Sequence, residues 1–162
     1  MRKLIIVILV CAAILTGCGA TPGAEVTVPS GQMQIGNPWK SYDTLTEAQT
    51  ASGLVFPLPK EIDGYKADIY RVMNGSLLEV QYRSGESTLT VRMQSGENED
   101  ISGVYEDFTT IETSTQNGAT VTKKQAADCL VYQISLNGYS YSVYITGTVS
   151  EDLCNEILSH IC

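Results

Sequence analysis

The sequence predicts an α+β domain. An antiparallel meander of about six or seven strands is expected to carry a short N-terminal helix and a C-terminal helix packed on one face. Three Asn-Gly pairs, which favour two-residue type I′ turns, separate segments in which apolar and polar residues alternate. An apolar stripe with helical spacing close to the C-terminus indicates the closing helix.

The N-terminal helix is predicted by the signals at its two ends. Thr44-Leu45-Thr46-Glu47 has the pattern of a capping box, in which Thr44 and Glu47 satisfy backbone amides at the helix start. Gly53 suits the left-handed position that ends many helices. Just before this helix, the only tryptophan, Trp39, is expected to cover an edge of the core, with a binding role as the alternative.

The Asn-Gly pairs organise the strand predictions. The hairpin around Asn137-Gly138 has the clearest pattern, because apolar residues alternate with polar ones on both of its arms. In the closing helix, Leu153 and Ile157 belong to the apolar stripe, and Thr148 or Ser150 is the candidate N-cap. The predicted strands are 65–73, 77–83, 88–94, 108–113, 119–124, 129–136 and 139–146.

Residues 1–17 are typical of a bacterial lipoprotein signal peptide. A basic start precedes the apolar run 4–15, which at 12 residues is shorter than the roughly 20 residues of a spanning helix. Leu15-Thr16-Gly17-Cys18 then resembles a lipobox. We expect cleavage before Cys18 and lipidation of its thiol, which would hold the protein at the outer side of the cell membrane. A plain secretory signal and a short uncleaved anchor are the alternatives.

Three parts of the chain follow from this reading: the signal peptide, a lipidated Cys18 with a flexible tether to residue 36, and a domain over 37–162. The chain has 10 basic and 18 acidic residues. Loss of Arg2 and Lys3 with the signal would leave a formal charge of −10. This charge disfavours nucleic acid as a partner. We expect a monomer, held to the membrane by its lipid, that binds an unidentified protein or small ligand.

Three cysteines lie in the domain. Cys154 and Cys162 are eight residues apart in the predicted closing helix, a rise of about 12 Å. This exceeds the Cα separation of about 7 Å that a disulfide tolerates. Any bridge should therefore join Cys129 to Cys154 or Cys162, and three unpaired thiols are the alternative.

No catalytic residue and no cofactor is predicted. The single histidine, His160, could pair with Cys129 as base and nucleophile, but a strand cysteine lacks the helix N-terminus that usually activates a thiol. We interpret His160 as a favourable charge near a helix C-terminus. The sequence contains neither the ligand spacing of a zinc site nor a glycine-rich phosphate loop.

Between Arg92 and Lys123 the chain is acidic and has no basic residue. A solvated loop is our interpretation of this segment, with calcium binding and a carboxylate-dependent hydrolase as alternatives. Asp100, Ser102 and Tyr105 form the candidate binding loop, because loops on a rigid sheet often carry function. An ordered turn held by Asp100 or Ser102 is the structural alternative. The acidic residues are Glu97, Glu99, Asp100, Glu106, Asp107 and Glu112.

Several short motifs occur in a characteristic order. They are Asn37-Pro38-Trp39, Asp43-Thr44-Leu45-Thr46-Glu47-Ala48, Gly53, Gly64-Tyr65, Val91-Arg92-Met93, Gly96, Asp100-Ile101-Ser102-Gly103 with Tyr105, and Gly138-Tyr139-Ser140-Tyr141-Ser142. Over residues 37–161 this series resembles an uncharacterised family of Gram-positive surface lipoproteins and membrane-anchored ectodomains. That domain of unknown function is also found after anti-sigma-factor-like segments. The resemblance implies an extracytoplasmic sensing or binding role and supplies no ligand or catalytic residue. Here a lipobox replaces the transmembrane segment, so direct signalling across the membrane is not expected.

The sequence therefore predicts a non-enzymatic binding module on a lipid-anchored, extracytoplasmic lipoprotein. A structural or assembly accessory of an envelope complex is the alternative function.

Overall fold

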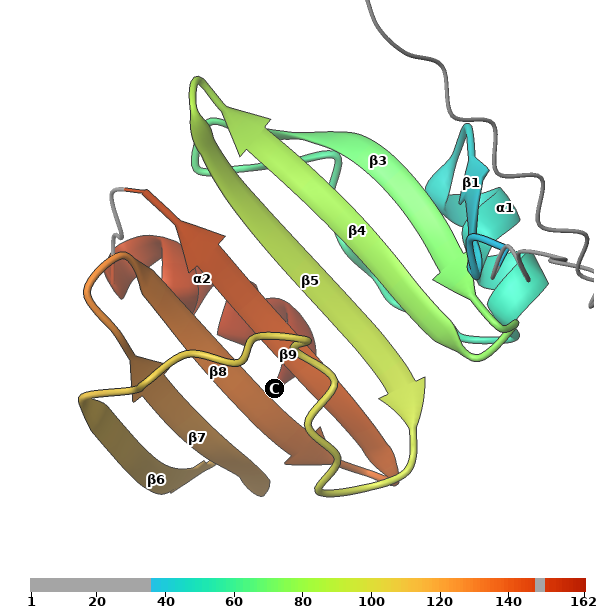
Figure 1. Ribbon diagram of the computed structural model, residues 1–162. Helices are drawn as coiled ribbons and strands as arrows, with labels where there is room; N and C mark the ends of the chain where they lie inside the picture. The colour runs from blue at the N-terminus through green and yellow to red at the C-terminus, as the bar shows by residue number, and fades with distance from the viewer. Residues whose placement is uncertain (1–35, 148–150) are drawn as a thin grey trace, which may run out of the picture. The chain divides into compact units, whose positions relative to one another are not determined.

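The computed structural model describes residues 36–147 and 151–162, which contain one antiparallel sheet and two helices (Figure 1). The predicted signal peptide, Cys18 and nearly all of the predicted tether lie outside these residues, as do the candidate caps Thr148 and Ser150. Neither helix in the described part of the chain has the length and apolar character needed to cross a bilayer.

The α+β class and the two helices are confirmed, but the described sheet has nine strands where about six or seven were expected. The additional strands are short: β1 has four residues and β2 has two, too few for an alternating pattern to be recognised in the sequence. The strands are β1 (Trp39–Tyr42), β2 (Glu61–Ile62), β3 (Tyr65–Met73), β4 (Leu77–Ser84), β5 (Ser87–Ser95), β6 (Thr110–Gln116), β7 (Ala119–Gln125), β8 (Cys129–Leu136) and β9 (Tyr139–Thr146). The helices are α1 (Leu45–Ser52) and α2 (Glu151–Ile161).

The strand order is β1-β3-β4-β5-β9-β8-β7-β6, with β2 paired to β3, so the sheet is not one simple meander. After β5 the chain crosses one face of the sheet as the 96–109 loop and starts β6 at the far edge (Figure 1). It then returns through β7 and β8, which brings β9 beside β5. This strand order places the buried strands β5 and β9 at the centre of the sheet and the exposed strand β6 at its edge.

The turns follow their sequences closely. In all three predicted Asn-Gly turns both residues have positive φ, between 49° and 85°, as type I′ geometry requires. Asp63-Gly64 adopts the same geometry between β2 and β3. The capping role of Thr44 is confirmed, because its Oγ1 accepts from the Glu47 amide over 3.2 Å. The Glu47 carboxylate reaches back one residue further than a standard capping box, to the Asp43 amide, also over 3.2 Å.

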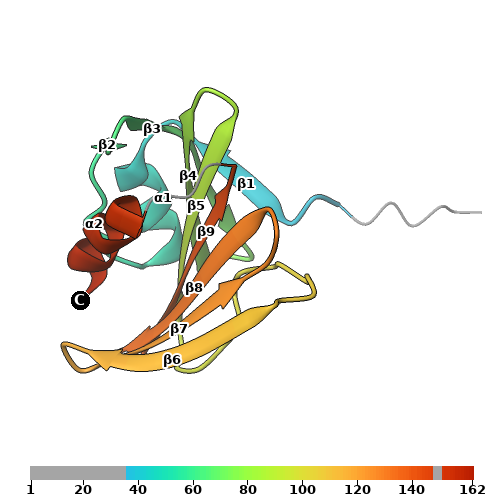
Figure 2. The same ribbon diagram turned by 90° about the vertical axis from the view of Figure 1, so that its left-hand side faces the viewer.

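The core lies between the sheet and the two helices, which cover the same face (Figure 2). Leu153 and Ile157 of α2 are buried there, and so are Phe56 and the central strand residues. Tyr82 is fully buried, and its hydroxyl donates to the Pro59 carbonyl over 2.8 Å. Burial raises the pKa of Tyr82 far above its ordinary range. The helices therefore lie on one side of the sheet, and the 96–109 loop lies on the other side.

Candidate functional site

The face of the sheet opposite the helices carries a continuous row of polar side chains. The row follows from the strand period of two, because the residues on either side of each member point into the helix-covered core. Its members are direct cross-strand neighbours from β3 to β6. In order they are Arg71, Glu79, Arg92, Ser142, Gln133, Thr122 and Thr113.

A buried carboxylate holds one end of this row together. Glu79 is fully buried, and its two oxygens lie 2.6 Å from Arg71 Nε and 2.7 Å from Arg92 Nε. Gln81 also donates to Glu79, over 2.8 Å. Such a carboxylate is stable in the interior only because several donors replace the water it has lost.

Trp39 completes the ion cluster and does not belong to the core, so its expected place at a core edge is wrong. The Arg71 guanidinium carbon lies 4.3 Å from the Trp39 ring centroid, and that of Arg92 lies 5.6 Å away. Both distances fit cation–π contacts. The reason lies in the register: β1 pairs with β3, which puts Trp39 opposite Met73 on the polar face.

Arg92 fastens the 96–109 loop to the sheet. Its Nη1 donates to the Ile101 carbonyl over 2.9 Å and also to the Ser102 carbonyl. A guanidinium can do this while binding Glu79, because its donors form a rigid planar fork. Gly103 allows the close approach, since a Cβ there would lie 2.6 Å from Arg92 Nη1.

The candidate binding residues Asp100 and Ser102 hold this loop in shape. Asp100 Oδ1 accepts from the Ser102 amide at 3.0 Å and from its hydroxyl at 2.6 Å, and Oδ2 lies 3.1 Å from Lys124 Nζ. Burial opposes ionisation of Asp100, but the Ser102 hydrogen bonds and the Lys124 charge outweigh it and lower its pKa. Tyr105 is 97% exposed and takes no part in this cluster. The three residues therefore do not form one site.

The start of the loop is fixed to β8 and β9. The Asn98 amide donates to Ser135 Oγ, and the Glu99 amide donates to Ser140 Oγ, each over 3.1 Å. The Ser140 hydroxyl donates in turn to the Gly96 carbonyl over 2.8 Å. Serine side chains from two neighbouring strands thus hold the backbone of the loop against the sheet.

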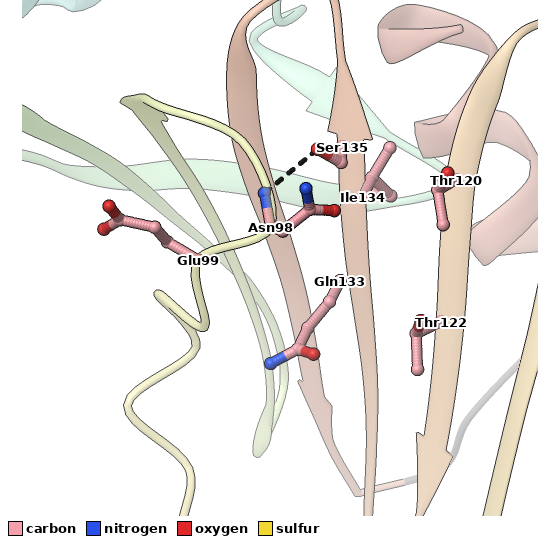
Figure 3. Close-up of a pocket in the computed structure, with 7 residues that line it drawn as sticks. All are labelled: Asn98, Glu99, Thr120, Thr122, Gln133, Ile134 and Ser135. Atoms are coloured by element: carbon pink, nitrogen blue, oxygen red, sulfur yellow. Dashed lines mark hydrogen bonds between the residues drawn. The ribbon is translucent and has the colours of Figure 1, made fainter.

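A pocket of about 190 Å³ lies between this part of the loop and strands β7 and β8 (Figure 3). Its chemistry is neutral, because hydroxyl and amide groups predominate. The side chain of Glu99 points away from β7 and β8 and accepts from Gln94 of β5 over 3.1 Å. The lining residues are Asn98, Glu99, Thr120, Thr122, Gln133, Ile134 and Ser135.

Two buried polar atoms, one of them on a residue that lines the pocket, have no hydrogen-bond partner in the described structure. They are Gln133 Nε2 and Ser142 Oγ, on directly opposed residues of β8 and β9. Most buried polar groups in native proteins are paired, and leaving one unpaired costs about 1–3 kcal/mol. Gln133, which also lines the pocket, therefore has a side-chain donor without a partner in the described residues.

Cys129 and His160 are not brought together. Leu130 and Tyr132 point to the helix-covered core, so the alternation of β8 puts Cys129 on the opposite face from His160 and α2. Burial and the nearby Glu106 carboxylate raise the pKa of the Cys129 thiol, which keeps the thiol protonated. This pair does not have the arrangement of a nucleophile and its base.

The structure does not bring the possible disulfide partners together. Cys129 is a free thiol. Cys154 belongs to the core on the helix-covered face, and Cys162 packs against that core. The sheet itself separates Cys129 from both predicted partners, and a bridge cannot pass through it.

The acidic residues of the loop are used individually. Glu97 accepts from the Gly138 amide over 2.7 Å, while Glu99 and Asp100 bind Gln94 and Lys124 as described above. Within residues 36–147 and 151–162, no three side chains of the metal-binding types gather in one place. The calcium alternative therefore has no ligand cluster in this part of the chain.

Sequence reasoning missed the residues that line the pocket. Thr120, Thr122, Gln133 and Ser135 are the polar members of the alternating patterns in β7 and β8. The pattern itself was a usable signal for a polar face. Only the crossing of the 96–109 loop turns part of that face into a pocket.

Comparisons of this chain with protein-family models, with curated proteins and with solved structures gave no match. The resemblance to a family of surface lipoproteins therefore stays a prediction from the motifs.

Proposed function

We propose that this protein is a lipid-anchored, extracytoplasmic lipoprotein whose domain binds a ligand, without catalysis, in the pocket between β7, β8 and the 96–109 loop. The observation that carries the proposal is the neutral, hydrogen-bonding lining, which includes Gln133, whose buried Nε2 has no partner in the described structure. The resemblance to surface lipoproteins implies that this binding is a sensing event at the cell surface.

The size and lining of the pocket suggest the class of ligand. Its volume of about 190 Å³ is below the roughly 300–1,000 Å³ of sites that enclose a drug-sized molecule. A single ring or a terminal group fits this space better than a whole cofactor. Hydroxyl and amide side chains both donate and accept, so we propose a neutral group rich in hydroxyls or amides, such as a sugar residue.

A binding role requires only that such groups are held in place. Asn98 is fixed through its amide to Ser135, and the loop is fixed through Arg92 to the sheet. Preformed walls of this kind lower the entropy lost on binding. The separation of Cys129 from His160 supports a binding function over thiol catalysis.

Binding can be tested by nuclear magnetic resonance titration of the full chain in nanodiscs with a panel of neutral saccharides and short peptides. We expect chemical shift changes at Thr122 and Gln133, and a binding loss of about fivefold for Thr122→Val, since one neutral hydrogen bond contributes roughly 1 kcal/mol. Thr115→Val, on exposed β6, is the matched control and should bind normally. Equal binding by both variants would rule out this pocket.

The anchor has its own test. Metabolic labelling with a radioactive lipid precursor should mark the wild-type chain and should be lost in Cys18→Ala. Cys11→Ala, within the predicted signal peptide, is the matched control and should keep the label. Labelling that survives Cys18→Ala would refute the lipobox.

An accessory role in an envelope complex is the second candidate function, and the exposed edge strand β6 favours it. Crosslinking in cells that captures one constant partner, together with ligand panels that give no binding, would support this role over ligand binding.

A further inference from the structure

The edge strand β6 is open for pairing. All seven of its residues are exposed, and no described strand pairs with its outer side. Figures 1 and 2 show it at the end of the sheet, joined only to β7. The outer backbone groups of such a strand form a ready template for another strand.

β6 has few of the features that usually protect an edge. Charged side chains, lysine above all, inward-pointing charges, proline, a bulge or a very short strand normally limit edge-to-edge pairing. β6 instead pairs with β7 in an unbroken register and contains three threonines, with Glu112 as its only charge. The opposite edge is protected, because β1 has only four residues and includes Lys40.

The outward backbone groups of β6 belong to alternate residues. In a hairpin closed by a two-residue turn, the flanking pair is hydrogen-bonded, and bonded and non-bonded pairs then alternate. β9 follows this rule. Tyr139 flanks the turn to β8, and the carbonyl group of the residue before it, Gly138, points to the opposite side of the strand. There it accepts from the Gly96 amide, on the β5 side. In β6 the same rule leaves Ile111, Thr113 and Thr115 with their N–H and C=O groups directed outward.

We propose that β6 pairs antiparallel with β6 of a second copy of this chain, about a two-fold axis at Thr113. Thr113 then faces Thr113 of the second copy, and Ile111 faces Thr115 of the second copy. Three bonded pairs give about six main-chain hydrogen bonds. Glu112 faces a serine, Ser114, so the two carboxylates are not directly opposed.

This dimer differs from the monomer expected from the sequence, and its energetics make it weak. A strand pair buries little apolar surface, and each whole chain has a formal charge of −8. Raising the salt concentration should therefore strengthen the association, since salt screens the repulsion between the copies. The inference does not depend on the ligand pocket.

Disulfide trapping with the full chain in membranes tests the register. In a bonded antiparallel pair the Cα atoms are about 5.5 Å apart, within the range that a disulfide spans. Thr113→Cys should therefore give an oxidised dimer whose bridge maps to position 113 on both chains. Thr115→Cys is the matched control, since its counterpart lies four residues further along, roughly 13 Å away.

A mixture of Ile111→Cys and Thr115→Cys chains should form a mixed bridge, because the register puts these positions opposite one another. Thr113→Pro should remove one outward N–H without touching the bonds to β7, and the full chain in detergent should then sediment as a monomer. Equal trapping at 113 and 115, no trapping at 113, or trapping at 113 only to another protein would each overturn the proposal.

Discussion

The guanidinium of Arg92 lies 2.7 Å from the carboxylate of the fully buried Glu79. The same guanidinium holds the 96–109 loop through the carbonyls of Ile101 and Ser102. The orientation of the loop therefore depends on a carboxylate inside the sheet, which the loop does not contact. Because the loop is one wall of the pocket, Glu79 and Arg92 link the stability of the sheet to the shape of the candidate site.

Removing the charge of Glu79 should destabilise the domain. Glu79→Gln leaves Arg71 and Arg92 without their shared counter-ion, and breaking a buried pair costs about 3–5 kcal/mol. We expect the lower end, about 3 kcal/mol, because the two arginine side chains are 26% and 17% exposed. Urea unfolding measures the change. Glu86→Gln, in an exposed turn, should change stability by less than about 0.5 kcal/mol.

Replacing Arg92 with lysine should release the loop while keeping the charge. A lysine ammonium can bind Glu79, but it does not reproduce the planar fork that also reaches the loop carbonyls. In Arg92→Lys, hydrogen exchange of the loop amides should therefore become faster, while the amides of β5 and β9 stay protected. Arg83→Lys, whose pair with Asp68 is largely exposed, should leave the loop amides unchanged. Normal loop exchange in Arg92→Lys would show that Arg92 does not hold the loop.

Alanine substitutions at Gly103 and Gly53 distinguish the stability cost of backbone strain from the cost of a steric contact. Both have positive φ, 65° and 70°, so alanine should cost about 1 kcal/mol at either position. At Gly53 the added Cβ meets open space, whereas at Gly103 it would lie 2.6 Å from Arg92 Nη1. We expect Gly103→Ala to destabilise the domain by at least about 1 kcal/mol more than Gly53→Ala in urea unfolding. Equal losses would contradict the close approach of Arg92.

Acid should loosen the loop through Asp100. Its pKa is lowered in the folded protein, so the charged form favours folding. This contribution is fully present above the ordinary aspartate pKa of about 3.9 and is lost as the pH falls through the lowered value. A carboxyl titration by nuclear magnetic resonance should locate the pKa. Lys124→Met removes one cause of the shift, so it should raise that pKa. An unchanged value would mean that the Lys124 contact does not contribute.

Much of the fold could be predicted from the sequence because it depends on local signals. Asn137-Gly138 determines a turn by its backbone preference, and the alternating residues of β8 and β9 identify both arms and both faces. The capping box and Gly53 gave the ends of α1 in the same way. The two missed strands, β1 and β2, are short and are defined by their pairing with β3.

The candidate site was less predictable because it consists of long-range contacts. The turn held by Asp100 and Ser102 is predictable from its residue types, whereas no local pattern singles out Gln133 and Thr122 as lining residues. They lie in strands more than twenty residues beyond the Asn98 segment that forms the opposite wall. A polar residue in an alternating strand is predicted to be solvent-exposed unless another segment is known to cover it.

The sequence by itself determined the class of the fold, the turns, the two helices and the two faces of each central strand. These depend on backbone preferences and on the strand period of two, which act over a few residues. Only the tertiary structure decided that β9 lies beside β5, that Trp39 stacks on arginines and that Cys129 is separated from Cys154. It also decided where the loop crosses the polar face. The physical reason is that the buried ion pair of Glu79 and Arg92 and the burial of β5 and β9 depend on strand order, which no local pattern encodes.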